Sequence, residues 1–402
     1  MSSTAVSAGT PVRRDWLVPL ALFCVGHFFV DLYSSALAVF QPLLVEHFRL
    51  TFTQAGILGG LLSFSSSVMQ PVYGYLSDRF HSPLFSTLAP AVAGVFISSL
   101  GLAPGYWALI AMVWLGGAGI ASFHPQAASN AIHLVQGNRG RAMAIFICSG
   151  TVGLAMGPAF FSAITGALGL GGAAWGAVPG VLVSVLLVAS LRELPSAAPA
   201  RAKLDFAPLR AVWKPMTILY FLVVIRSIVQ VVFTQMLPLY LHTHRNYSLK
   251  SASYMLSVYL LGGALGGLAG GSLADRFGGR FVITVSMIGS VPFLAMFLFT
   301  GGFASAAGLF LGGLMLLFTI PVNVVMAQEL LPSQAGVVSA LMMGFAWGMA
   351  GLIFIPLTGW VSDVFSMQAA FTALIFFPLI GFALALKLPK QRQSEAAGAL
   401  NP

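Results

Sequence analysis

The chain has 402 residues, of which 58% are hydrophobic and only 7% are charged. Soluble domains carry about 25% charged residues, so this composition excludes a water-soluble globular protein and indicates a polytopic membrane protein. The formal net charge of +9 falls mainly on short loops, where it predicts membrane topology and argues against nucleic-acid binding. The two cysteines, Cys24 and Cys148, lie in apolar segments and predict no disulfide framework.

Twelve apolar runs are long enough to cross a bilayer, because a spanning helix needs about 20 mostly apolar residues. The first run follows a short polar N-terminus without a cleavage pattern, which predicts an uncleaved first helix. The sequence therefore predicts an all-α membrane protein with twelve transmembrane helices. The predicted helices cover residues 16–40, 53–75, 84–103, 107–132, 142–168, 173–191, 215–240, 253–274, 280–300, 304–327, 336–361 and 367–387.

The longest loop divides these helices six and six and carries five basic residues. It predicts three parts: an N-terminal six-helix bundle (1–191), a cytoplasmic central loop (192–214) and a C-terminal six-helix bundle (215–402).

The lysines and arginines predict the orientation of the chain. If the N-terminus is cytoplasmic, fifteen of them face the cytoplasm, and only Arg49, Arg245 and Lys250 face the other side. The positive-inside rule therefore predicts that both termini are cytoplasmic. Arg226 is in neither count because it falls near the middle of the seventh helix.

Two loops share a pattern. Residues 74–80 read Gly-Tyr-Leu-Ser-Asp-Arg-Phe, and residues 271–280 read Gly-Ser-Leu-Ala-Asp-Arg-Phe-Gly-Gly-Arg, at a shift of 197 residues. The same shift, about half the chain, places the first helix on the seventh. This predicts two pseudo-symmetric bundles of similar design, an architecture in which transporters bind their substrate between the repeats.

These loops resemble the signature loop of the major facilitator superfamily, Gly-x-Leu-x-Asp-Arg-x-Gly-x-Arg. The second copy matches throughout, whereas residues 81–83 of the first replace the glycine and the trailing basic residues. The resemblance implies the major facilitator fold with a cytoplasmic latch, in which the aspartate of each loop faces the start of a helix in the other half. For Asp78 that helix is the eleventh, which starts near Gly336. The alternative is that the loops are only charged turns. The implied latch residues are Gly74, Asp78, Arg79, Gly271, Asp275, Arg276, Arg280, Arg139 and Arg141.

Further motifs resemble the fosmidomycin resistance branch of this superfamily. They are His27-x-x-x-Asp31, Leu50 to Gly56, Gln70 to Tyr75, Ser122 to Pro125, Arg139 to Ala142, and Gly153-x-x-x-Gly157-Pro158. Members of that branch carry a glutamate after the His-Pro pair. Gln126 stands at that position here, which removes one proton carrier.

Asp31 is the one carboxylate that lies well inside an apolar run. A charged carboxylate at bilayer depth costs several kcal/mol, so such residues are usually functional. His27 is four residues away and shares its helix face. Two interpretations stand: Asp31, with His27, carries protons because apolar surroundings favour its neutral form, or it is a permanently charged partner of Arg226.

Arg226 lies close to the position equivalent to Asp31, since 31 plus 197 gives 228. A guanidinium at membrane depth needs a partner, and its planar donors suit a phosphonate, phosphate or carboxylate. Arg226 either neutralises Asp31 or binds an anionic substrate, with Gln230 one turn on. In the fourth helix His124 and Gln126 flank Pro125, and Asn323 follows a proline in the tenth, so these three are candidate cavity residues. For the histidines the alternative is a hydrogen bond to a neighbouring helix.

Gly150, Gly153, Gly157 and Pro158 resemble the glycine-proline motif of drug–proton antiporters, which implies close packing at the interface between halves and favours export. The alternative is ordinary packing of small residues.

Together these features predict a proton-coupled secondary transporter that exports a small polar or anionic compound by alternating access. The resemblance implies fosmidomycin-like drug efflux by antiport from the bacterial cytoplasmic membrane. A proton-coupled symporter or facilitator for an organic acid or sugar remains the alternative. No phosphate-binding loop, metal-ligand cluster or catalytic triad is visible in the sequence, so neither an enzyme nor a cofactor beyond the proton gradient is predicted. A monomer is expected, with the substrate, protons and lipid as its partners.

Overall fold

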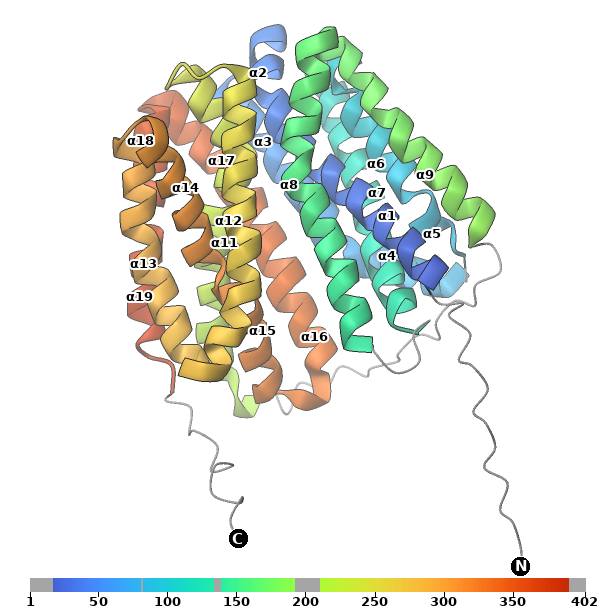
Figure 1. The fold of residues 1–402 in the computed structure, drawn as a ribbon. Coiled ribbons are helices and arrows are strands. Elements are labelled where there is room, and N and C mark those ends of the chain that lie inside the picture. The colour runs from blue at the N-terminus through green and yellow to red at the C-terminus, as the bar shows by residue number, and fades with distance from the viewer. Residues whose placement is uncertain (1–16, 81, 134–138, 192–209, 390–402) are drawn as a thin grey trace, which may run out of the picture.

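The computed structural model describes residues 17–80, 82–133, 139–191 and 210–389, and these residues form helices joined by short connections (Figure 1). The all-helical prediction is confirmed for these residues. The described chain begins and ends at the same end of the bundle, which we call the basal end; the opposite end is the distal end.

The first half of the chain forms six successive helices, several of them interrupted. Their segments are α1 (Leu17–Ser34) with α2 (Ala36–Phe48), α3 (Phe52–Ser63) with the π-helical η1 (Phe64–Val68) and α4 (Gln70–Phe80), α5 (Leu84–Thr87) with α6 (Ala89–Ser98), η2 (Leu100–Leu102), α7 (Tyr106–His133), α8 (Arg139–Gly172), and η3 (Ala173–Gly176) with α9 (Ala177–Ser190).

The second half repeats this plan. Its segments are α11 (Trp213–Thr243), α12 (Leu249–Phe277), α13 (Gly279–Phe299), α14 (Gly302–Leu317) with α15 (Thr319–Leu330), η4 (Pro332–Gln334), α16 (Ala335–Ser339) with the π-helical η5 (Ala340–Phe345) and α17 (Ala346–Val364), and α18 (Met367–Leu374) with α19 (Phe377–Ala385).

Within the described ranges, nine helical stretches are long and apolar enough to cross a membrane. One of them, Arg141–Ser190, holds two predicted helices, which separate at Gly169, where φ is +71°. The predicted helices at 53–75 and 84–103 are outside the nine. They form α3 to α4 and the short pair α5–α6. The nine stretches hold ten of the predicted helices, because Arg141–Ser190 holds two, and the helices at 53–75 and 84–103 complete the twelve.

The apolar core follows the two halves. One cluster of buried side chains draws only on residues 20–191 and another only on residues 216–388. The third belongs to the second half, except that Ala38 of α2 and Ala55 of α3 join it. The halves therefore share apolar packing near the distal ends of these helices. The exact domain boundaries stay a prediction, because residues 192–209 lie outside the described ranges.

The seam between α3 and α17 is tight at its distal end and opens toward the basal end (Figure 1). The separation of the two halves can be followed at the glycines of α16, η5 and α17, because the distance from an added Cβ to the nearest atom shows how closely the other half approaches. Toward the distal end, a Cβ added at Gly359 would overlap Phe52 O and one at Gly351 would overlap Ser63. Toward the basal end, a Cβ at Gly344 would lie 3.6 Å from Ser67 O, and one at Gly336 would meet nothing within 4 Å. The halves thus touch distally and diverge basally.

Candidate functional site

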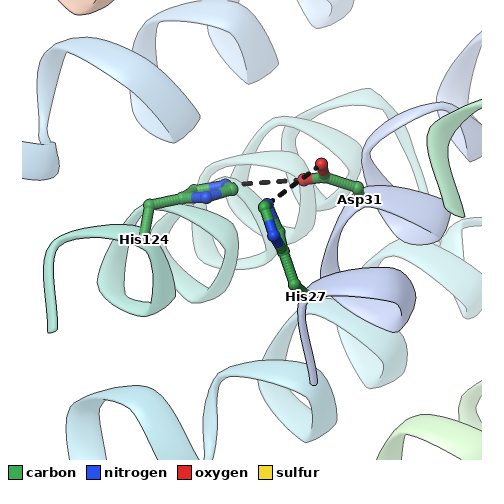
Figure 2. Close-up of side chains that lie close together, drawn as sticks. All are labelled: His27, Asp31 and His124. Carbon is green, nitrogen blue, oxygen red and sulfur yellow. Dashed lines mark ion pairs between the residues drawn. The ribbon is translucent and has the colours of Figure 1, made fainter. Parts of the chain in front are cut away.

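Three titratable side chains meet inside the first half (Figure 2). His27 and Asp31 lie one turn apart on α1, and His124 reaches them from α7. His27 Nε2 is 3.3 Å from Asp31 Oδ2, and His124 Nε2 is 3.5 Å from Asp31 Oδ1. We call these residues the His–Asp–His cluster. The side chains of Asp31 and His124 keep 19% and 24% of their exposure, so the cluster is not sealed inside the protein.

The hydrogen bonds of His27 define how many protons the cluster holds. Its Nδ1 lies 2.8 Å from the carbonyl oxygen of Phe146 on α8, and a carbonyl oxygen can only accept, so Nδ1 must carry the proton. In a neutral imidazole Nε2 would then present a lone pair to the Asp31 carboxylate. The pair is attractive only if one further proton lies between them, either as imidazolium with carboxylate or as imidazole with carboxylic acid. His27 and Asp31 therefore form a site for one exchangeable proton.

The backbone of α8 closes one side of the cluster. A Cβ added at Gly150 would overlap both His27 Nε2 and Asp31 Oδ2, and one added at Gly153 would overlap Phe28 O. The predicted glycine-proline motif therefore packs α8 on α1 within the first half, since Gly157 likewise meets Ser35 and Leu32 O. These glycines face α1, while α8 also packs against α12 of the second half, so a role of the motif at the interface between halves stays a prediction.

The cluster also contains ligand types that a divalent metal takes. One ligand atom from each of the three residues lies within 4.8 Å of the others. The sequence showed no such cluster, because His124 comes from a distant helix. The spacing of His27 and Asp31 also fits a shared proton, so the same three residues suit either a proton or a divalent metal by their chemistry.

Arg226 does not pair with Asp31 in this structure. It is 5% exposed in the middle of α11 and donates from Nη1 to Gln230 Oε1, while its Nε has no partner among the described residues. The proposed Asp31–Arg226 ion pair is therefore absent from the described chain, and the two histidines take its place. The physical reason is that the histidines belong to the same half as Asp31, whereas Arg226 lies across the interface.

The second half also buries further polar groups that lack partners among the described residues. Asn323 on α15 is fully buried, and neither atom of its amide has a hydrogen bond within the described chain. The hydroxyl of Tyr259 on α12, which the sequence analysis missed, is equally buried and unpaired. An unsatisfied buried polar group costs about 1–3 kcal/mol, so such groups call for an explanation such as a bound ligand or water.

Gln126 is turned away from the cluster, and its prediction as a substrate-binding residue is not supported. Its Oε1 accepts from Ser86 N at 3.1 Å, and its Nε2 donates to Ser82 O at 3.0 Å. Both ends of the amide thus hold the segment around α5 against α7, a structural task.

The predicted basal latch is not engaged between the described residues. The side chains of Asp78 and Arg139 lie outside the described part of the chain. Asp275 and Arg141 are exposed, Arg276 lies 5.1 Å from the ring of its neighbour Phe277, and Arg280 donates to Leu386 O within its own half. The remaining latch residues are Gly74, which faces Pro125, exposed Arg79, and Gly271, which has nothing within 4 Å of an added Cβ. The latch therefore stays a prediction.

The fold and the arrangement of polar residues between two helical halves define a membrane transporter. The family model of the Major Facilitator Superfamily matches residues 23–355 and 219–400, and the chain belongs to this superfamily. It is a transporter and not an enzyme.

Relatives extend over nearly the whole chain. It is 31% identical to the uncharacterized MFS-type transporter YfnC of Bacillus subtilis (strain 168) over 383 residues, 93% of each chain. It is 28% identical to the fosmidomycin resistance protein of Escherichia coli (strain K12) over 395 residues, 97% of each chain, which confirms the resemblance read from the motifs.

Among solved structures, an inward-facing, unoccupied bacterial homolog of the human lysosomal transporter Spinster superposes with a TM-score of 0.79 at 16% identity. The match covers 93% of this chain and 97% of that one. A point mutant of the nucleoside transporter NupG superposes with a TM-score of 0.78 at 13% identity, covering 93% of this chain and 100% of that one. At these identities the likeness shows the fold alone.

Proposed function

We propose that this chain is a proton-coupled antiporter of the bacterial cytoplasmic membrane that exports small anionic or polar compounds of the fosmidomycin type. The observation that carries the proposal is the His–Asp–His cluster, a site for an exchangeable proton in one half, set against a buried and incompletely paired arginine in the other. The similarity to a fosmidomycin resistance protein supports the substrate class.

The charges support an orientation with the basal end in the cytoplasm. Among the described residues the distal end carries only Arg49, Arg245 and Lys250, and the remaining exposed arginines and lysines lie basally. By the positive-inside rule the basal end is cytoplasmic, and both termini with it. The seam is closed distally and open basally, which is the arrangement of an inward-facing transporter.

Competition at Asp31 would couple the substrate to the proton. When the His27–Asp31 proton leaves to the cytoplasm, the bare carboxylate can accept a hydrogen bond from a hydroxyl or N–H group of a substrate. The anionic end of the same molecule would pair with Arg226, whose planar donors suit a phosphonate or carboxylate. After the transporter changes to the outward-facing state, a proton from outside would bind again between His27 and Asp31 and displace the substrate from the carboxylate. In this scheme the switch lies within the His–Asp–His cluster, and Asp31 needs no ion pair with Arg226.

The test uses inside-out vesicles with an acidic lumen and a pH-sensitive dye. Fosmidomycin added outside should release lumenal protons with the native protein. With Asp31→Asn this proton release should be lost, while downhill exchange of substrate persists. Glu46→Gln is the matched control, because Glu46 is a distal carboxylate with 61% exposure that lies outside the cluster. Full proton release by Asp31→Asn would remove Asp31 as the carrier.

The opposite direction of coupling is the alternative. A proton-coupled symporter or a facilitator for an organic acid or sugar could use the same fold, and the fucose:proton symporter FucP superposes with a TM-score of 0.60 at 15% identity over 94% of this chain. In the same vesicles a symporter would move substrate and protons in one direction. Substrate uptake without counter-movement of protons would therefore favour this alternative.

A further inference from the structure

Asp363, at the distal end of α17, reaches across the interface to the first turn of α3. Its Oδ1 accepts from Phe52 N at 2.8 Å, and its Oδ2 accepts from Thr53 N at 2.8 Å and from Thr53 Oγ1 at 2.5 Å. The contact joins residues 310 positions apart in the chain. No motif in the sequence indicated it, because Asp363 looks like an ordinary exposed charge after an apolar run.

The contact completes the N-terminus of α3. A helix leaves its first N–H groups without partners inside the helix. Here Thr51 Oγ1 accepts a hydrogen bond from Gln54 N, and Gln54 Oε1 accepts one from Thr51 N, which together form a capping box. The N–H groups of Phe52 and Thr53 remain, and these are the two that Asp363 accepts. The negative charge also lies at the positive end of the helix dipole.

Close packing beneath the contact makes its geometry demanding. A Cβ added at Gly359, one turn before Asp363, would overlap Phe52 O, and one at Gly56 would meet Ile355 O at 2.7 Å. The helices approach so closely here that the carboxylate can reach the backbone of α3 only while the distal seam is shut.

A second contact across the distal end is weaker. His242 Nε2 of α11 lies 3.3 Å from Glu46 Oε1 of α2, but the Glu46 side chain is 61% exposed. Exposed ion pairs contribute little to stability. Asp363 is exposed too, but its carboxylate accepts three hydrogen bonds across this end, two of them from backbone N–H groups at a helix N-terminus.

We propose that Asp363 is the extracellular latch of this transporter: it holds the distal end closed in the inward-facing state and must leave α3 before the outward-facing state can form. The latch predicted from the sequence would join the same pair of helices at the cytoplasmic end, with Asp78 in the last turns of α4 facing the start of α16. One helix pair then carries an aspartate contact at each end, engaged alternately. The inference rests on the orientation and alternating access of the proposed function, and on neither its substrate nor its proton site.

The test measures access from outside without any substrate. Ala55 on α3 is 1% exposed and packs into the core of the second half just beneath the latch. In a chain with both native cysteines replaced, Ala55→Cys is labelled with a membrane-impermeant maleimide in right-side-out vesicles. Adding Asp363→Asn should raise the labelling rate roughly tenfold, the effect expected for losing a charged cap at a helix N-terminus. Adding Glu46→Gln should change it less than about twofold.

Three controls separate opening from other causes. Lys250→Cys, exposed at the distal surface, must be labelled in every background, which reports the orientation independently of the latch. Ser98→Cys, fully buried in the core of the first half, must stay unlabelled, which excludes general unfolding. Asp363→Ala serves as a second variant that removes every acceptor. Unchanged labelling of Ala55→Cys with both Asp363 variants in folded protein would overturn the latch, whereas failure of Lys250→Cys to label would instead refute the orientation.

Discussion

Gly150→Ala gives the sharpest test of the His–Asp–His cluster. Its added methyl group would overlap both His27 Nε2 and Asp31 Oδ2, the two atoms that hold the exchangeable proton between them. These atoms are already 3.3 Å apart, at the long end of a hydrogen bond. Relief of the overlap by a shift of roughly 1 Å in either side chain would break their interaction.

The free-energy balance can be worked from the same contact. Overpacking a close contact costs about 1–3 kcal/mol. Alanine gains up to about 1 kcal/mol over glycine in a helix interior. The helix gain is the same whether the pair is intact or broken, so the paired geometry is penalised by the overpacking cost of about 1–3 kcal/mol, and about 1.4 kcal/mol corresponds to a tenfold loss of its population. We expect proton-coupled transport to fall roughly tenfold while exchange of substrate changes less.

The assay is the dye-based release of protons from inside-out vesicles at matched amounts of protein. Gly166→Ala is the matched control, since Gly166 lies on the same helix and has nothing within 4 Å of an added Cβ. Thermal unfolding of both purified variants checks that α8 remains packed. If Gly150→Ala couples protons as well as Gly166→Ala does, the cluster does not carry the transported proton in the geometry described.

The remaining predictions concern the second half, α7 and the latch. Arg226→Ala should weaken binding of anionic substrates far more than that of neutral analogues, measured with purified protein; equal losses would leave Arg226 a structural residue. Gln126→Ala should lower the free energy of unfolding by about 1–3 kcal/mol, because Ser86 N and Ser82 O lose their partner, with the ratio of substrate to protons unchanged. A changed ratio of substrate to protons would show that Gln126 takes part in transport. Thr53→Cys combined with Asp363→Cys should form a disulfide that stops transport until it is reduced, and transport that continues in the oxidised protein would show that the distal seam need not open.

Local patterns carried much of the fold and part of the site. Apolar runs of spanning length, the bias of basic residues toward alternate loops and the repeat at a fixed shift are all properties of neighbouring residues, and a membrane makes each of them decisive. The pairing of His27 with Asp31 was predictable for the same reason, because residues four apart share a helix face. An ion pair with Asp31 was one of two alternatives for Arg226 and rested on the repeat alone, and equivalent positions in two halves do not guarantee contact.

Only the tertiary structure decided which distant side chains meet. It turned His124 toward Asp31 and Gln126, two residues on, toward α5, because helix rotation sends neighbours on one helix to different faces. It also revealed Asp363, whose partners are backbone N–H groups that every residue except proline carries and that no sequence pattern can therefore mark. The sequence by itself determined which segments cross the membrane and which residues are costly there. The packing of one half against the other decided which of them act together, since those contacts depend on the relative placement of helices far apart in the chain.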